Sequence, residues 1–325
     1  MSAKYRIAAY GPENSVVKEV AKPEDVKEYL GKYSVTWLDC MGANEKDVET
    51  LGSIFNFHKL TQHSYFHSQQ RSKLEDYGTY FFLIIKEIEY KKEIKGHKVG
   101  VYTGNNYVVT LRENASEIFE PIVQMINGKN PRIMSEGPDY LCYLLIDEIV
   151  NQYMPILDSF EKQIDGIENE ILGTVSQETL KRIFKIKRDL LNFRKILWPI
   201  RDMLLRFERG SMPNLSDKTR VYLRDVYDHM ITITEIVETY RELTSNVVEA
   251  YLSTISNNIN QVVKVLTVLA SLAVPATIIT SFYGMNLTFP DQKFFGEETG
   301  YYFVLLLMLV STAALLLFFW RKKWI

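Results

Sequence analysis

Two uncharged, mostly apolar stretches near the C-terminus, residues 265–282 and 301–320, constrain how this chain can fold. Each is long enough to cross the hydrocarbon core of a bilayer as a helix, which needs about 20 apolar residues. Charged residues are concentrated before these stretches: 71 of the first 264 residues are charged, against 4 of the next 56. We therefore predict a chain that spans a membrane twice, although its average composition is that of a soluble protein.

Positive residues at the ends of the two stretches predict their orientation. Lys264 precedes the first stretch and Arg321, Lys322 and Lys323 follow the second, whereas the segment between them has more acidic than basic residues. The positive-inside rule places both termini in the cytoplasm of a multi-pass cell-membrane protein, with residues 284–300 as an outer loop. The absence of a signal peptide and two cysteines far apart in the charged part agree with a reducing compartment for that part.

The charged part of the chain divides into a mixed segment and a helical segment. Residues 1–138 alternate β-branched and aromatic runs with amphipathic runs, the pattern of a cytoplasmic α/β domain. We predict strands at residues 4–11, 34–40, 79–90, 98–104 and 106–113, and helices at residues 23–30, 44–55 and 116–126. Gly104-Asn105-Asn106 predicts a hairpin turn between the last two strands.

Residues 139–264 form a predicted helical bundle whose last helix continues into the first membrane stretch. We predict long helices at residues 140–172, 177–207 and 216–283. The third has no glycine and one proline, so a continuous helix of about 100 Å is expected at 1.5 Å per residue. Its cytoplasmic part carries apolar residues at spacings of three, four and seven: Val226, Met230, Ile233, Val237, Tyr240, Val247 and Tyr251. Such a seam requires packing on the preceding helices or self-association.

A stripe of mostly small or polar residues follows one face of the first membrane stretch, within the pore domain predicted at residues 265–325. Its members recur in steps of four and three and are called the polar stripe below: Ser256, Asn260, Val263, Thr267, Ala270, Val274, Thr277 and Ser281. Small residues are common where membrane helices pack together. The same residues line a water-filled path if several copies surround an axis. Because the stripe has no charge, an ion on that path keeps much of its water or is bound by hydroxyls and carbonyls.

The motif Tyr283-Gly284-Met285-Asn286 directly follows this stretch. In this position it resembles the signature of the CorA family of magnesium channels. Other segments that resemble this family are 260–286, WPIRD at 198–202, RDVYDH at 224–229 and RKKW at 321–324. The resemblance is strong from about residue 140 to the end and looser before it. It implies an α+β cytoplasmic domain, a helical stalk and two transmembrane helices (about 265–283 and 301–320) in a funnel-shaped homopentamer whose first span lines the pore.

The resemblance assigns the outer mouth of the pore, its selectivity filter, to Gly284, Met285 and Asn286. Mg²⁺ suits such a site because it prefers octahedral oxygen coordination and loses its water reluctantly. Asn286 supplies a neutral oxygen, and Gly284 lets the backbone turn. The ion implied as substrate and regulatory ligand is Mg²⁺, with Co²⁺ or Ni²⁺ as further substrates. The membrane potential suffices as driving force, because a divalent cation gains roughly 4.6 kcal/mol across 100 mV.

Channels of the CorA family close when Mg²⁺ binds between neighbouring cytoplasmic domains. The resemblance therefore implies a regulatory site on this chain. Asp225 matches the family pattern, Asp228 is the next candidate, and Glu89 is a candidate partner on the α/β domain. The alternative for either aspartate is a solvated helix face or an ordinary ion pair with Arg220 or Arg224, which is the commoner role of a surface aspartate.

Two further groups of residues would act at the inner side of the membrane. Val263, Leu266 and Val274 are expected to form a hydrophobic gate along the pore-lining face. Lys264 and the terminal cluster of Arg321, Lys322 and Lys323 predict a basic collar at the cytoplasmic rim. Lysines that snorkel to the lipid headgroups explain the same residues.

Two departures from the family keep alternatives open. The outer loop reads LTFPDQKFFGEETG instead of the frequent MPEL, and His63 and Ser64 replace a frequent acidic pair. Together with His58 and His67, His63 leaves a zinc, cobalt or nickel transporter possible, while Met285 favours the magnesium branch. A membrane-anchored coiled-coil scaffold without transport is a second alternative. No nucleotide-binding or common hydrolase motif occurs, and the near-neutral charge argues against nucleic-acid binding, so we expect no enzyme.

Overall fold

A computed structural model of the chain describes residues 3–67, 71–173, 176–209, 214–285 and 290–324. It divides into two compact units, one of Met1–Asn169 with Ser176–Val247 and one of Glu170–Val175 with Val248–Ile325. The boundary predicted after residue 138 lies inside the first unit, because the helices that follow pack on the sheet. The boundary predicted after residue 264 lies within one continuous helix.

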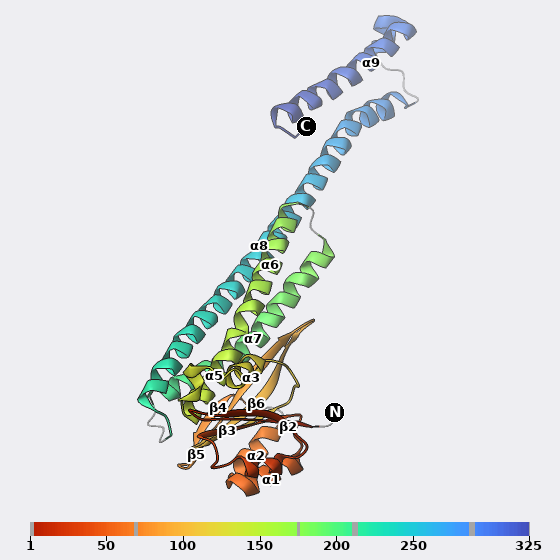
Figure 1. Ribbon diagram of the computed structural model, residues 1–325. Helices are drawn as coiled ribbons and strands as arrows, with labels where there is room; N and C mark the ends of the chain where they lie inside the picture. The colour runs from red at the N-terminus through yellow and green to blue at the C-terminus, as the bar shows by residue number, and fades with distance from the viewer. Residues whose placement is uncertain (1–2, 68–70, 174–175, 210–213, 286–289, 325) are drawn as a thin grey trace. The chain divides into compact units, whose positions relative to one another are not determined.

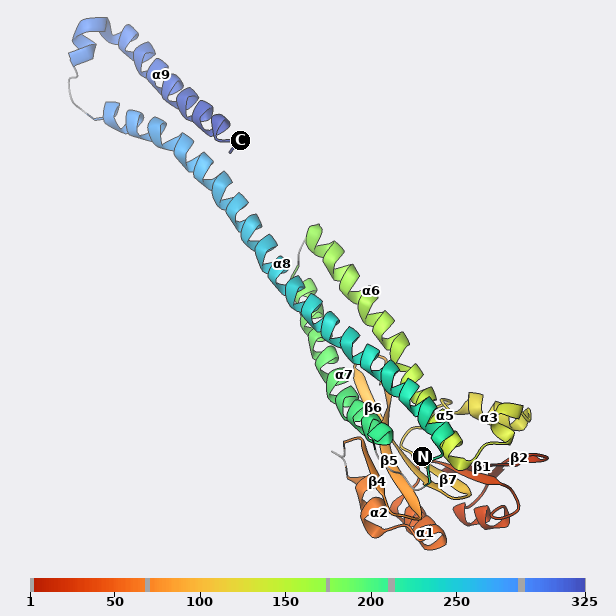
Figure 2. The same ribbon diagram turned by 90° about the vertical axis from the view of Figure 1, so that its left-hand side faces the viewer.

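The first unit contains a seven-stranded mixed sheet among its described residues, in the order β2-β1-β3-β7-β6-β5-β4 (Figures 1 and 2). The strands are β1 Lys4–Tyr10, β2 Ser15–Val20, β3 Val35–Met41, β4 Lys73–Asp76, β5 Tyr80–Tyr90, β6 Ile94–Gly104 and β7 Tyr107–Arg112. β3 and β7 are parallel, and the other neighbouring strands of this sheet pair antiparallel. The hairpin predicted after Gly104 is confirmed, since β6 and β7 are joined by two residues and pair Thr103 with Val108.

Helices cover both faces of the sheet. On one face, α1 (Glu45–Phe55) and α2 (Lys59–Phe66) lie over a core to which they contribute Val48, Leu51 and Tyr65. On the other face lie α3 (Glu120–Asn127), α5 (Pro138–Asn151) and α7 (Gln177–Arg209). Two edge-to-face ring pairs mark this second layer, Trp37 with Phe119 and Phe81 with Phe207. Burial on both faces explains the continuous apolar run at the start of β5.

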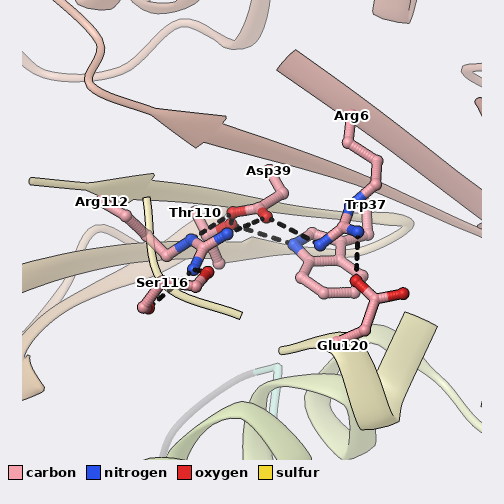
Figure 3. A network of polar contacts seen from close by, with 7 residues as sticks. All are labelled: Arg6, Trp37, Asp39, Thr110, Arg112, Ser116 and Glu120. Atoms are coloured by element: carbon pink, nitrogen blue, oxygen red, sulfur yellow. Dashed lines mark hydrogen bonds and ion pairs between the residues drawn. The ribbon is translucent and has the colours of Figure 1, made fainter. Parts of the chain in front are cut away.

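A buried polar network joins the centre of the sheet to α3 (Figure 3). Asp39 on β3 accepts two bonds from Arg112 on β7, from Nε to Oδ1 at 2.9 Å and from Nη2 to Oδ2 at 2.7 Å. Thr110 Oγ1 donates to the same carboxylate at 2.7 Å and accepts from Trp37 Nε1 at 3.1 Å. Arg6 Nη2 approaches Asp39 at 3.5 Å, while its Nη1 donates to Glu120 on α3 at 2.7 Å.

This network fixes the parallel β3 and β7 pair. Asp39 and Arg112 are almost fully buried, and the remaining Arg112 nitrogen, Nη1, donates to the carbonyl of Ser116 at 2.7 Å. A buried carboxylate and guanidinium are tolerated only when paired and hydrogen-bonded in this way. The strands are therefore held in register by charge as well as by apolar packing.

The helices α5, α6 (Tyr153–Leu172), α7 and α8 (Asp217–Tyr283) follow one another along the chain. The segment predicted as one helix at residues 140–172 is divided at Gln152. Pro155 accounts for the break, because a proline clashes with the carbonyl four residues before it. α8 begins as predicted, since Ser216 Oγ accepts from the N–H of Thr219 at 3.2 Å and donates to Asp139 Oδ2 of α5 at 2.7 Å.

The apolar seam of α8 is buried by the preceding helices. Val226, Met230, Ile233 and Val237 have at most 1 % of their surface exposed. Contacts to two of those helices flank the seam: Tyr222 stacks on Tyr143 of α5 with centroids 5.1 Å apart, and the α7 guanidinium of Arg194 pairs with Glu238 at 2.9 Å. The prediction that the seam packs on the preceding helices is thus confirmed for this part of α8.

The second unit contains the last part of α8 and helix α9 (Pro290–Arg321). α8 and the Gly300–Arg321 part of α9 are long and apolar enough to cross a membrane, and only 6 % of the most apolar window of each is buried. α9 begins eleven residues earlier than the span predicted at residue 301, so much of the expected outer loop is helical. Pro290 favours this start, because a proline fits the first turn of a helix and lacks the N–H that would be unpaired there.

Candidate ion pathway

Gly284 ends α8 at the expected outer mouth. The N–H of Gly284 donates to the carbonyl of Thr280 at 2.8 Å, and the N–H of Met285 donates to that of Phe282 at 3.3 Å. A Cβ at position 284 would lie 3.0 Å from the Thr280 carbonyl oxygen, so a glycine relieves crowding in this last turn. The Met285 side chain is half exposed. Asn286, the remaining residue of the predicted filter, lies outside the described residues.

The polar stripe is exposed over its whole length. All eight of its members, from Ser256 to Ser281, are exposed, as is Leu266. The hydroxyl groups of Thr267 and Thr277 donate to the carbonyls of Val263 and Ala273, at 2.8 and 2.9 Å. With its hydrogen used inside the helix, each hydroxyl oxygen presents only acceptor lone pairs outward. A row of such acceptors suits the outward-pointing hydrogens of a hydrated cation.

A different face of α8 is covered. Val268 is buried and Leu272, Pro275 and Ile279 are partly covered, again at steps of three and four. α9 lies alongside this part of α8 in both views (Figures 1 and 2), and its own less exposed residues have the same spacing: Val304, Met308, Ser311, Leu315 and Phe319. The two spans therefore leave the polar stripe uncovered rather than packing on it.

The predicted basic collar is assembled in part. Arg321, Lys322 and Lys323 are exposed at the end of α9. Lys264 at the start of the first span donates from Nζ to the carbonyl oxygen of Lys323 at 2.9 Å. The structure thus brings Lys264 to the C-terminal cluster.

The regulatory candidate Asp225 is exposed on α8. Its negative charge acts on Asp147 of α5, whose pKa is raised mainly by burial and further by Asp225. The Asn151 amide and His229 act in the opposite direction on the pKa of Asp147. Two carboxylates at this position attract a cation, and a cation there would relieve their repulsion.

Asp147 was not among the sequence candidates. The available signal was an acidic pair, Asp147-Glu148, within the otherwise apolar α5.

The second regulatory candidate, Asp228, is also exposed on α8, and its carbonyl accepts from Thr232 Oγ1 at 3.3 Å.

The carboxylate of Glu89 is paired with residues of its own hairpin. It lies near the end of β5, where its carboxylate pairs with Lys91 at 2.6 Å and His97 at 3.4 Å. The hydrogen bond from Lys91 is the main reason that the pKa of Glu89 is lowered. Within one chain, the contacts described for Glu89 therefore tie it to its own hairpin and not to Asp225.

The three histidines around α2 serve separate local roles. His58 caps the helix by accepting the N–H of Leu60 at 3.2 Å, and His67 accepts from Lys98 Nζ through its carbonyl at 3.3 Å. His63 lines a cavity of about 390 Å³ between α1 and α2. Among the residues that the structure describes, no group of three or more His, Cys, Asp and Glu is placed to hold a metal ion. A complete site within these parts of a single chain is therefore not formed.

Comparison with known proteins identifies the family that this chain matches. A family model described as CorA-like Mg²⁺ transporter protein matches residues 32–323. The cobalt/magnesium transport protein CorA of Thermotoga maritima is 34 % identical over 270 residues, which cover 82 % of this chain and 77 % of that protein. The protein of the same name from Methanocaldococcus jannaschii is 24 % identical over 258 residues, covering 79 % and 81 %.

Solved structures share the fold. The complete CorA magnesium transporter of Methanocaldococcus jannaschii superposes with a TM-score of 0.83 at 23 % identity, covering all of both chains. The cytoplasmic domain of ZntB from Vibrio parahaemolyticus has a TM-score of 0.62 at 11 % identity, covering 78 % of this chain and 99 % of that one. The similarity to the complete transporter covers the full chain, including its two apolar helices.

Proposed function

We propose, from the premise that this chain belongs to the CorA-like Mg²⁺ transporter family, that it is a homopentameric channel for Mg²⁺ uptake driven by the membrane potential. One observation carries this proposal: an uncharged stripe of exposed residues follows one face of the first span up to the Gly284 turn. A scaffold gains nothing from such a surface in a membrane. Five copies around an axis would enclose it as a neutral path.

The chemistry of the stripe supports passage of a hydrated ion. Mg²⁺ gives up its water slowly, so a pore that strips the ion completely would conduct poorly. The Thr267 and Thr277 hydroxyls, with their hydrogens directed to the helix, offer acceptors for the hydrogens of bound water. Gly284, Met285 and Asn286 would form the outer filter, where five Asn286 amide oxygens accept from the water shell before the ion enters.

An apolar constriction is expected nearer the cytoplasm. Val263, Leu266 and Val274 have 53, 65 and 51 % of their surface exposed in the single chain. In a pentamer, rings of such side chains exclude water when they are close together, which is how hydrophobic gates block ions. Opening would then require the first spans to move apart.

Regulation would use the carboxylates at the α5 and α8 contact. Mg²⁺ at Asp225 and Asp147, with Asp228 close by on α8 and Glu89 as a further candidate, would be held between subunits when cytoplasmic Mg²⁺ is high. Burial is the main reason that the pKa of Asp147 is raised, and the charge of Asp225 adds to it, so a cation beside the two carboxylates would stabilise their charged forms. A single chain supplies too few ligands, so the neighbouring subunit would complete the shell.

The regulatory proposal predicts that Asp225→Ala weakens inhibition by internal Mg²⁺. We expect the half-inhibitory concentration to rise at least about tenfold, which corresponds to about 1.4 kcal/mol of lost binding energy. The measurement is uptake into proteoliposomes loaded with graded Mg²⁺. Asp165→Ala, which removes an exposed aspartate from α6, is the matched control. Inhibition that is equal in both variants would remove Asp225 from the regulatory site.

The transport proposal itself is tested by ion flux. Purified protein in liposomes with an inside-negative potential should take up Mg²⁺, and Co²⁺ competes if the substrate range is that in the names of its relatives. Preference for Zn²⁺ or Ni²⁺ over Mg²⁺ would favour the alternative cation transporter. No flux of any of these ions would leave the scaffold as the remaining hypothesis.

A further inference from the structure

The C-terminal end of α9 forms a hook. The helix ends at Arg321, and Lys323 adopts the left-handed conformation with φ of 56°. Its N–H donates to the carbonyl of Trp320 at 3.0 Å, and the N–H of Trp324 donates to that of Phe319 at 2.9 Å. The Trp324 ring stacks on Phe319 with centroids 5.7 Å apart. This is a Schellman helix end with its usual apolar contact.

Two features of the hook require support from outside it. Position 323 is one where glycine is usual, and a lysine there is in a strained backbone conformation. The carbonyl of Lys323 also lies beyond the last helical bond, so no hydrogen bond within α9 satisfies it. A donor that reaches this carbonyl would stabilise the whole turn.

Lys264 supplies that donor from the other span. Its Nζ donates to the Lys323 carbonyl oxygen at 2.9 Å and lies 5.9 Å from the centre of the Trp324 ring. The first contact is a charge-assisted hydrogen bond and the second a cation–π contact. The Lys264 side chain is only partly exposed, although its neighbours on both sides are exposed. Both of these contacts of its ammonium group are to residues of the hook.

We propose that Lys264 is a positioning residue that clasps the inner end of the second span to the inner end of the first. The clasp consists of the Lys264 ammonium, the Lys323 carbonyl and the Trp324 ring. It makes the two spans move together at the cytoplasmic side and aims the exposed side chains of Arg321 and Lys322. Its effect on flux rests on the proposed channel function, in which the first span lines the path.

The first test measures the order of the tail in the full-length protein. A nitroxide attached at Lys323→Cys reports mobility, because the clasp uses the carbonyl of residue 323 and not its side chain. The native thiols, Cys40 and Cys142, are buried. We expect Lys264→Met to shorten the nitroxide correlation time at least twofold, and Lys264→Arg to retain the native value. Lys322→Met removes the same charge at the same rim and should leave the mobility unchanged.

The second test compares the effect of the variants on maximal Mg²⁺ flux with their effect on the half-saturating external Mg²⁺ concentration. Because the clasp is at the end of the span opposite the Gly284 turn, Lys264→Met should lower maximal Mg²⁺ flux at least threefold and leave the half-saturating external concentration unchanged. Lys264→Arg should restore the flux, and Lys322→Met should reduce it less.

Three outcomes would overturn the proposal. Unchanged nitroxide mobility in Lys264→Met would remove the clasp, and equal flux losses in Lys264→Met and Lys322→Met would reduce its role to charge. Altered mobility with normal flux would show that the clasp does not position the pore. If native protein carries no flux, the mobility comparison still decides whether the clasp exists, and only the proposed function fails.

Discussion

Mg²⁺ uptake should fall at least about a hundredfold when Asn286 is replaced by alanine. In a pentamer the substitution removes five amide oxygens from one ring, and a hydrogen bond between neutral groups, here the amide and ion-bound water, contributes about 1 kcal/mol. Loss of about three such contacts in the rate-limiting entry step accounts for a factor of one hundred. The measurement is initial uptake into proteoliposomes at a fixed membrane potential.

Controls must separate the filter from the fold. Asn258→Ala makes the same change on α8 outside the polar stripe and should leave uptake near the native rate. Both variants should elute as the same oligomer in detergent. Uptake by Asn286→Ala within twofold of native would mean that the amide does not contact the ion on its path.

The membrane part of the chain was predictable because its signals are local. Absence of charge defines the spans, and the stripe from Asn260 to Ser281 is visible in steps of three and four that any straight helix preserves. The stripe is uncovered in the single chain and the covered face of α8 contains Val268 and Leu272 instead, while the role of the stripe as a pore face stays a prediction.

The parts that the sequence did not predict depend on contacts between distant segments. β2 and β4 are the edges of the sheet, and their short sequences SVVKEV and KLED have little apolar alternation because half of their pairing is absent. Asp147 becomes a candidate only once the fold brings α8 close enough for the charge of Asp225 to act on it. The contact of Lys264 with Trp324 joins residues 60 positions apart and depends on a left-handed backbone at Lys323, which no residue preference indicates for a lysine.

The same reasoning applies to the buried charges of the sheet, where sequence indicates two ordinary strands and the structure reveals an ion pair. Asp39 and Arg112 are on the adjacent parallel strands β3 and β7, and each is almost fully buried. The pair is not expected to stabilise the fold strongly by itself, because removal of two charges from water offsets most of their attraction. Removing one member of the pair is strongly destabilising, because the other charge then stays buried without a partner.

Asp39→Asn should therefore destabilise the first unit by about 3–5 kcal/mol, the usual effect of leaving one member of a buried pair unpaired. Urea unfolding of the full-length protein in detergent, followed by circular dichroism, measures the shift. Asp202→Asn is the matched control, because Asp202 pairs with Arg201 at 3.0 Å on the surface, where the expected loss is below about 1 kcal/mol. Adding Arg112→Met to Asp39→Asn should recover part of the stability, since the unpaired guanidinium is then gone. If the double variant is as unstable as the sum of its single variants, the two side chains do not interact, and the register of β3 and β7 must be held by apolar packing alone.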